Sequence, residues 1–256
     1  NRPGHDIVDH YTYTFLGDGC MMEGISHEVA SLAGTLGLGK LICFYDDNGI
    51  SIDGEVEGWF TDDTVERFRA YGWHVIPNVD GHSSQEVKLA IENARKNTDQ
   101  PTLICCKTII GFGAPNKQDT SNSHGEPLGE EELAAAKRNL GWPEDARFLI
   151  PGDVLEHMRT AIEEGAERES SWKQNFAAYR EQYPAAASEY ERIMRGVLPS
   201  DWEAQLPTFE PDKKGMATRN ASGTVINALA AVLPELIGGS ADLAPSNKTL
   251  INGEPD

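Results

Sequence analysis

Two short turns contain the residue types best suited to bind a phosphate group and a metal ion. The first, Gly17-Asp18-Gly19, comes directly after a predicted strand and directly before a predicted helix. Its glycines permit a tight turn, and the start of the helix offers unpaired N–H groups and a partial positive charge that suit a phosphate. The second turn is Asp-Asn-Gly-Ile at residues 47–50, at the end of the next predicted strand.

These two turns could share one cation. In a parallel sheet both lie at the carboxyl ends of strands, which is the edge where ligands bind. If the two strands are neighbours, the Asp18 carboxylate, the Asn48 amide oxygen and a backbone carbonyl near Ile50 can converge on one ion. Such oxygen ligands, completed by phosphate oxygens and water, suit Mg²⁺, and Ca²⁺ can substitute. The spacing predicts a diphosphate anchor. The alternative is a helix N-cap at Asp18 and an ordinary turn at Asn48.

A parallel sheet is needed to bring the turns together, and the sequence predicts one. Between residues 11 and 108, short apolar runs alternate with runs of helical period, which is typical of a parallel sheet flanked by helices. The runs are nearly continuous in apolar residues, as expected of strands covered on both faces. The predicted fold class is α/β, doubly wound. The predicted strands are Tyr13–Leu16, Leu41–Asp46, His74–Val79 and Thr102–Lys107.

Two amphipathic helices are predicted between these strands. In each, apolar residues recur at helical spacing, so one face carries an apolar stripe. The second helix follows Ser83 and Ser84, either of which can cap it. The stripes are Ile25, Val29, Leu32 and Leu36 in the first helix, and Val87, Ile91 and Ala94 in the second.

The remaining sequence predicts a long loop, a helical region and the start of a second domain. Residues 109–129 show no period and are rich in Gly, Pro, Asn, Ser and Thr, which indicates a functional or disordered loop. Acidic helical sequence follows to about residue 197. We predict a first domain over residues 1–197, a linker over 198–217 and the start of a second α/β domain over 218–256, with a strand at Leu236–Leu243. An aromatic core stripe is expected at Trp172, Phe176, Tyr179 and Tyr183.

The composition argues against several classes of protein. The sequence has 41 Asp and Glu against 22 Lys and Arg, a net charge of −19, which leaves no basic surface for nucleic acid. No apolar run reaches the roughly 18 residues of a membrane span, and the first residues of the given sequence do not show the basic-then-apolar order of a secretion signal. The four cysteines lack zinc-ligand spacing and suit buried thiols in a reducing compartment. We expect a cytoplasmic protein with no membrane partner, and a chain that is a piece of something longer.

The two turns belong to a longer string that resembles one enzyme family. Residues 17–54, GDGCMMEGISHEVASLAGTLGLGKLICFYDDNGISIDG, closely resemble transketolases, which are thiamine-diphosphate-dependent enzymes. The resemblance implies the thiamine-diphosphate-binding fold. It spans nearly the whole chain and is loose only at about residues 145–215. It continues in EGWFTDD (57–63), RFRAYGWHV (67–75), KTIIGFGAPNK (107–117), SHGEPLG (123–129) and GGSADLAPSN (238–247).

The resemblance implies roles for residues at both turns and in the long loop. It implies that Asp18, Asn48 and the Ile50 carbonyl hold the Mg²⁺ of the cofactor diphosphate, and that Gly19 and Asn48 contact the diphosphate itself. It also implies that His124 touches cofactor and sugar and stabilises charge on a substrate oxygen. From the sequence alone, a solvated loop histidine is the alternative for His124.

Other implied residues lie in the predicted second domain and at a subunit interface. Arg219 and Ser246 correspond to the family's ligands for substrate phosphate, which fits because a guanidinium matches phosphate oxygens bidentately. Asp242 corresponds to an aspartate that contacts the cofactor from the partner subunit of a homodimer. Glu23 and Glu28 correspond to glutamates that link the two active sites; the alternative is ordinary first-turn helix carboxylates.

The implied activity is reversible transfer of a two-carbon ketol unit from a ketose phosphate to an aldose phosphate, in the pentose phosphate pathway. The glutamate that protonates the cofactor's aminopyrimidine in this family lies outside these 256 residues, so we expect the chain to be inactive by itself. Two other possibilities are a dihydroxyacetone synthase, which would share the anchor but use a different acceptor, and a non-enzymatic interaction module, which would bind no cofactor.

Overall fold

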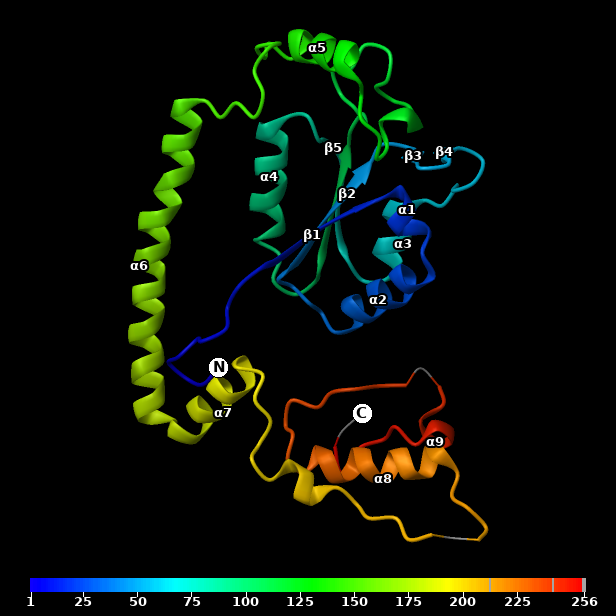
Figure 1. Cartoon of the computed structure of the whole chain (residues 1–256), viewed down its shortest axis with the longest axis vertical. Helices are drawn as coiled ribbons and strands as arrows, with labels where there is room; N and C mark the ends of the chain where they lie inside the picture. Colours follow the sequence, from blue (N-terminus) through cyan, green and yellow to red (C-terminus); the bar gives the residue numbers. More distant parts are fainter. Residues whose placement is uncertain (212, 241, 255–256) are drawn as a thin grey trace. The chain divides into compact units, whose positions relative to one another are not determined.

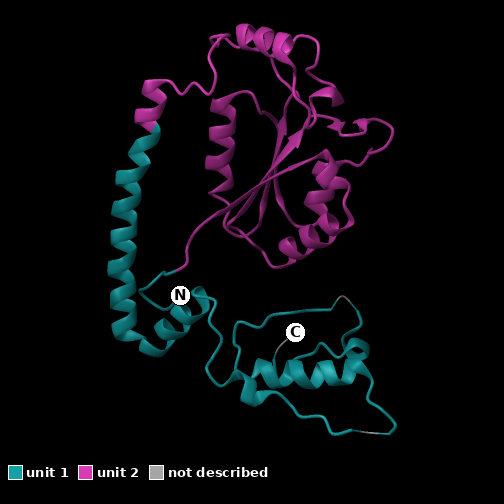
Figure 2. Ribbon diagram, in the orientation of Figure 1, with its two compact units in different colours: residues 1–7, 158–256 teal, residues 8–157 magenta. Residues whose placement is uncertain are grey.

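The computed structural model describes residues 1–211, 213–240 and 242–254, and they form two compact units. One unit comprises residues 8–157 and contains a parallel sheet with helices (Figure 2). The other comprises residues 1–7 and 158–256 and is largely helical. The domain boundaries inferred from composition, at residues 197 and 217, stay a prediction.

The sheet of residues 8–157 has four parallel strands (Figure 1). They are ordered β1-β2-β6-β5, and β2 and β6 lie in the middle. This confirms the predicted α/β class and places the two predicted turns at the ends of neighbouring strands. The strands are β1 (Thr12–Gly17), β2 (Leu41–Asp47), β5 (His74–Asp80) and β6 (Thr102–Lys107).

Helices cover both faces of the sheet, as doubly wound folds require. On one face, α4 (Ser84–Ala94) packs its alanines against Ile42, Phe44 and Ile104. On the other face lie α1 (Asp18–Met22), α2 (Gly24–Thr35) and α3 (Thr64–Ala70) (Figure 1). Ser83 is the N-cap of α4 and accepts a hydrogen bond from the Glu86 N–H at 3.3 Å, which confirms one of the two expected caps. The core beneath α1–α3 consists of Met21, Ala30, Ala33, Cys43, Tyr45, Phe68, Trp73, Val75, Leu103 and Cys105.

The apolar stripe of α2 is not its buried face. Ala30 and Ala33 are the buried residues of α2, whereas Ile25 is 62% exposed and Leu32 57%. The small residues let the helix approach closely, and the indole N–H of Trp73 donates to the Ala30 carbonyl at 2.8 Å. The large apolar side chains of α2 are therefore left on the surface of this unit.

The rest of this unit is a hairpin, a loop and a helix. The hairpin pairs β3 (Ile50–Ser51) with β4 (Gly54–Glu55) in antiparallel fashion. The long loop contains the short 3-10 helix η1 (Ser121–Ser123), and α5 (Glu130–Asn139) follows it. α5 has three glutamates in its first turn and two basic residues in its last, which matches the helix dipole.

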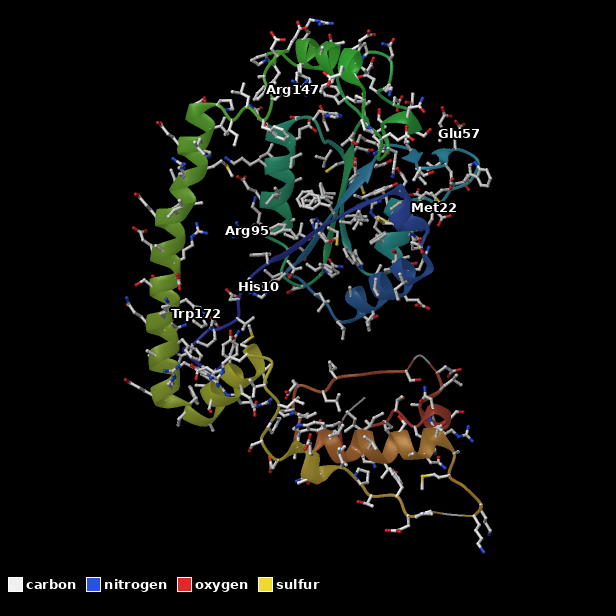
Figure 3. All side chains as sticks on the ribbon, viewed as in Figure 1. His10, Met22, Glu57, Arg95, Arg147 and Trp172 are labelled. Atoms are coloured by element: carbon white, nitrogen blue, oxygen red, sulfur yellow. The ribbon has the colours of Figure 1, made fainter. Side chains whose placement is uncertain are left out.

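The second unit is built around two helices and the chain's first residues. α6 (Gly152–Gln182), which begins in the other unit, is followed by α7 (Pro184–Met194). Trp172, labelled on α6 in Figure 3, donates its indole N–H to the Ile7 carbonyl at 2.9 Å. Ile7 is buried with Phe176, Tyr179 and Ala187, and Tyr183 packs against them, which confirms the expected core stripe for these three aromatic residues, whereas Trp172 is 38% exposed. The other elements are η2 (Trp202–Gln205), α8 (Thr218–Ala230) and α9 (Ala244–Asn247).

The strand expected at Leu236–Leu243 is wrong for the described residues of that segment. Residues 236–240, 242 and 243 form no strand, and the side chain of Ile237 is 92% exposed. A strand needs a neighbour for its backbone hydrogen bonds, and the described residues of this unit form no sheet that could pair with it.

In the described parts of the chain, no helix combines the length and the apolar character that crossing a membrane requires.

Candidate functional site

Asp18 is the buried polar residue at the junction of β1 and α1. Its side chain lies where the strand ends at Gly17, and the residue is only 3% exposed. One carboxylate oxygen accepts a hydrogen bond from the Tyr45 hydroxyl at 2.5 Å, and the other accepts one from the Gly49 backbone N–H at 2.9 Å. The two turns predicted from the sequence therefore meet directly at one edge of the sheet.

The second turn is fixed by its own side chain. The Asn48 amide oxygen accepts a hydrogen bond from the Ile50 N–H at 2.9 Å, which is an Asx turn. Gly49, at φ +73°, takes the left-handed conformation that glycine adopts without strain. The Gly49 carbonyl then accepts from the Val56 N–H at 2.9 Å, so the β3–β4 hairpin holds the turn from outside. Asn48 and Ile50 are thus held beside Asp18.

The surroundings of Asp18 supply neutral donors but no counter-charge. Among the described residues, no basic side chain forms an ion pair with its carboxylate. Burial, reinforced by the hydrogen bond to Asp18, raises the pKa of Tyr45 far above its usual range, so the phenol stays protonated and donates. A buried carboxylate without a cation is costly. The donor set therefore fits a divalent cation.

A cavity of 270 Å³ adjoins Asp18 and has room for an ion with its water. Its lining includes Asp18, Tyr45 and Gly49. Asp47 and Lys107 also line it and form an ion pair at 2.5 Å, so Lys107 pairs with Asp47 and not with Asp18. Clusters of three or more His, Cys, Asp or Glu that could hold a metal are not found among the described residues. Asp62 and Asp63 line the cavity as well, whereas the side chains predicted beside Asp18 at the second turn, Asn48 and Ile50, do not. Phosphate oxygens and water could complete the coordination of a hard cation bound by Asp18.

Gly19 leaves open space above the start of α1. A Cβ atom built on it would have no other atom within 4 Å, and the residue is exposed. The backbone here is accessible to a ligand, which suits the predicted contact between Gly19 and a diphosphate.

His124 lies in the loop that follows β6. The residue is exposed and caps η1, where its backbone N–H donates to the Ser121 carbonyl at 2.9 Å. The loop begins at the carboxyl end of β6, which is the sheet edge that also carries Asp18. The structure therefore places His124 in a loop that leaves the sheet at the same edge as the two turns.

The three residues expected to act from the second domain belong to the other compact unit. Arg219 is exposed in the first turn of α8, Ser246 is exposed in α9, and Asp242 is exposed just before α9. The residues that the structure brings together are Asp18, Asn48 and Ile50. The assignment of all these residues to metal, cofactor and substrate stays a prediction.

Tyr45 is the site residue that sequence reasoning missed. The register of β1 and β2 pairs Leu16 with Tyr45, so the tyrosine stands one place before the end of β1. The available signal was a hydroxyl in an otherwise apolar run, three residues before Asn48. A buried tyrosine hydroxyl needs a partner, and the carboxylate of the neighbouring turn supplies it.

Comparison with known proteins identifies the family. Residues 1–199 match the family model described as "Transketolase, thiamine diphosphate binding domain". This chain belongs to the transketolase family.

The relatives are similar along almost the entire chain. It is 58% identical to Transketolase 1 of Escherichia coli (strain K12) and 59% identical to Transketolase 2 of Aliivibrio fischeri, in each case over 99% of this chain and 38% of the relative. The chain thus spans 38% of the length of these transketolases. Among solved structures, transketolase from Pichia stipitis in complex with sedoheptulose-7-phosphate matches with a TM-score of 0.90 and 42% identity, over 99% of this chain and 37% of that one.

Proposed function

We propose that this chain forms part of a transketolase that moves a two-carbon ketol unit from a ketose phosphate to an aldose phosphate. The observation that carries the proposal is the buried carboxylate of Asp18, which meets the Asn48 turn and has no basic partner among the described side chains. The family match over residues 1–199 supports thiamine diphosphate as the cofactor. The sugar-phosphate complex of the Pichia stipitis relative supports the substrate class.

The residues at the sheet edge would hold the cofactor through its diphosphate. Asp18, the Asn48 amide and the Ile50 carbonyl would bind Mg²⁺ or Ca²⁺, and Gly19 and Asn48 would contact the diphosphate. The chemistry that bound thiamine diphosphate supplies is a nucleophilic carbon that also accepts the electron pair released when the sugar's C2–C3 bond breaks. Tyr45 keeps Asp18 in place by donating to one oxygen while the other accepts from Gly49.

The remaining site residues would act on the sugar. His124, exposed in the loop after β6, would donate a hydrogen bond to the substrate oxygen on which negative charge develops, and so act as a catalytic residue. Arg219 would bind the substrate phosphate bidentately, and Ser246 would add a hydroxyl donor. Asp242 would contact the cofactor of the partner subunit.

The apolar surface of α2 supports a homodimer. Ile25, Val29, Leu32 and Leu36 are 51–62% exposed, and Val29, Leu32 and Leu36 also line an apolar cavity of 430 Å³ between α2 and the sheet. An exposed apolar face of this extent marks an interaction surface. We propose that a second copy covers it, with Glu23, the N-cap of α2, and Glu28 of α2 at the interface and the active sites nearby.

Location and pathway complete the proposal. All four cysteines are free, and three of them are buried thiols, which suits a reducing compartment such as the cytoplasm. Ketol transfer between sugar phosphates places the protein in the pentose phosphate pathway.

A coupled ketol-transfer assay with the full-length protein tests the function. Xylulose 5-phosphate as donor with ribose 5-phosphate as acceptor should give turnover that requires thiamine diphosphate and a divalent cation. Asn48→Ala should reduce the affinity for the cofactor, whereas Asn93→Ala, an exposed asparagine on α4, should not. Preference for formaldehyde as acceptor would identify a dihydroxyacetone synthase instead. Absence of cofactor binding would favour an interaction module and overturn the proposal.

A further inference from the structure

The turn after β5 contacts the first residues of the 109–129 loop. The His82 Nε2 atom accepts a hydrogen bond from the Ile109 backbone N–H at 2.9 Å. The imidazole also stacks on the Phe112 ring, with centroids 4.1 Å apart and planes inclined by 24°. β5 and β6 are neighbours in the sheet, so the turn and the loop leave it at the same edge. His82 therefore touches the loop twice, once by a hydrogen bond and once by its ring face.

The turn that presents His82 is itself held in place. The Asp80 carboxylate accepts a hydrogen bond from the His82 N–H at 2.9 Å, and the Gly81 N–H donates to the Lys107 carbonyl at 2.9 Å. A Cβ atom on Gly81 would lie 2.4 Å from the Thr108 methyl group, so a side chain here would force Thr108 to move. The imidazole of His82 thus lies on a turn that packs against Lys107 and Thr108, where the loop begins.

Contacts inside the loop lead from Ile109 to the neighbour of His124. The Ile110 carbonyl accepts a hydrogen bond from the Asp119 N–H at 2.8 Å. At Gly111, with φ +65°, a Cβ atom would lie 2.5 Å from the Ser123 hydroxyl oxygen, so the two segments of the loop are in close contact. Ser123 immediately precedes His124. A movement of Ile109–Gly111 would therefore also move the segment that carries His124.

We propose that His82 is a positioning residue for the loop that carries His124. The unprotonated Nε2 atom fixes the Ile109 amide, and the ring fixes Phe112, so the loop starts in one conformation rather than several. The catalytic effect expected for His82 rests on the proposed function, because it depends on the role of His124. The effect of His82 on the order of the loop does not depend on the proposed function.

Amide hydrogen exchange of the full-length protein without cofactor tests the structural part. In His82→Ala, exchange over residues 109–124 should be about fivefold faster, the loss expected for one hydrogen bond, while β6 stays protected. His82→Gln, whose amide oxygen can accept in place of Nε2, should restore most of the protection. His82→Phe should keep only the ring contact and give a smaller rescue. His10→Ala, which removes an exposed histidine of the same unit, is the control and should match the wild type.

Two results would overturn the structural part. Exchange in His82→Ala that equals the wild type over 109–124 would show that the loop does not depend on His82. Equal loss of protection in β6 and in the loop, not rescued by His82→Gln, would show that His82 only stabilises the unit.

Kinetics on the same variants test the catalytic part. In His82→Ala, kcat/KM for the sugar phosphates should fall about tenfold, with thiamine diphosphate affinity unchanged because Asp18 and Asn48 are untouched. His82→Gln should recover most of the activity. Faster exchange with unchanged kinetics would overturn the link to His124. A wild-type protein without ketol transfer would instead contradict the proposed function, and the exchange experiment would still decide the role of His82.

Discussion

Helices α2 and α4 flank the same sheet and carry similar apolar stripes, yet they use them differently. In α4, Val87 and Ile91 pack against the core, next to the buried Ala90 and Ala94. In α2, the whole stripe is more than half exposed, and the core contacts come from Ala30 and Ala33. Helical periodicity shows that a face is apolar, but it does not show which surface that face will cover.

In α2 the difference goes with a close approach to the turn between α3 and β5, which ends in Trp73. In α2, a Cβ atom on Gly34 would lie 1.8 Å from the Tyr71 carbonyl oxygen. Small residues of α2 thus face the core of this unit, and the large ones form the exposed surface on which the proposed homodimer rests. We interpret α4 as a helix that completes a core and α2 as a helix that also builds an interface.

Among substitutions that test this difference between α2 and α4, Gly34→Ala is expected to have the largest effect, which is on stability. Because the added methyl group would collide with backbone rather than a flexible side chain, the free energy of unfolding should fall by about 3 kcal/mol. Gly24→Ala is the matched control, since a Cβ atom there meets nothing within 4 Å, and it should change stability by less than about 1 kcal/mol. Urea denaturation followed by circular dichroism measures both. Equal stabilities would contradict the close approach of α2.

The second prediction concerns dimerisation through the exposed apolar stripe of α2. Leu32→Asp should weaken dimerisation by at least about 30-fold, the loss typical of a central interface residue, without altering the far-ultraviolet circular dichroism. Leu89→Asp on α4 is the control, because Leu89 is 59% exposed and Leu32 is 57% exposed. Sedimentation velocity across a concentration series separates the two. A dimer that tolerates Leu32→Asp as well as Leu89→Asp would remove α2 from the interface.

The smallest effect concerns the thiols beneath α1–α3. Burial raises the pKa of Cys43 and of Cys105 to about 12, so both stay protonated and unreactive at about pH 8 and become reactive only as the pH approaches that value. Cys20 is exposed and should react first with iodoacetamide. Peptide mapping of the Leu32→Asp variant, which should be monomeric if the proposed dimer is correct, measures this order. Equal rates for Cys20 and Cys43 would show that α2 does not seal the sheet.

Much of the fold could be predicted because the sheet is buried on both faces. Strands covered on both sides must be nearly continuous in apolar residues, so β2 and β6 stand out in the sequence. The meeting of Asp18 with the Asn48 turn followed from topology, since neighbouring parallel strands end at one edge. These predictions needed no knowledge of side-chain packing.

The rest depended on contacts that a sequence pattern does not record. The exposure of the α2 stripe depends on the depth of Gly34 against Tyr71, and the partner of Tyr45 depends on strand register. The segment 236–243 has the composition of a strand, but its described residues have no sheet partner. The roles of His124, Arg219, Asp242 and Ser246 came from resemblance to the family and not from their surroundings.

The central claim is that Asp18 and the Asn48 turn hold a divalent cation that binds a diphosphate. Isothermal titration calorimetry of full-length protein with thiamine diphosphate, over a series of Mg²⁺ concentrations, tests it most directly. Asp18→Asn, which keeps the shape but removes the charge, should weaken binding by at least about 100-fold and abolish its Mg²⁺ dependence, while the exposed control Asp145→Asn should do neither. Cofactor affinity and Mg²⁺ dependence in Asp18→Asn equal to those of the wild type would contradict the account.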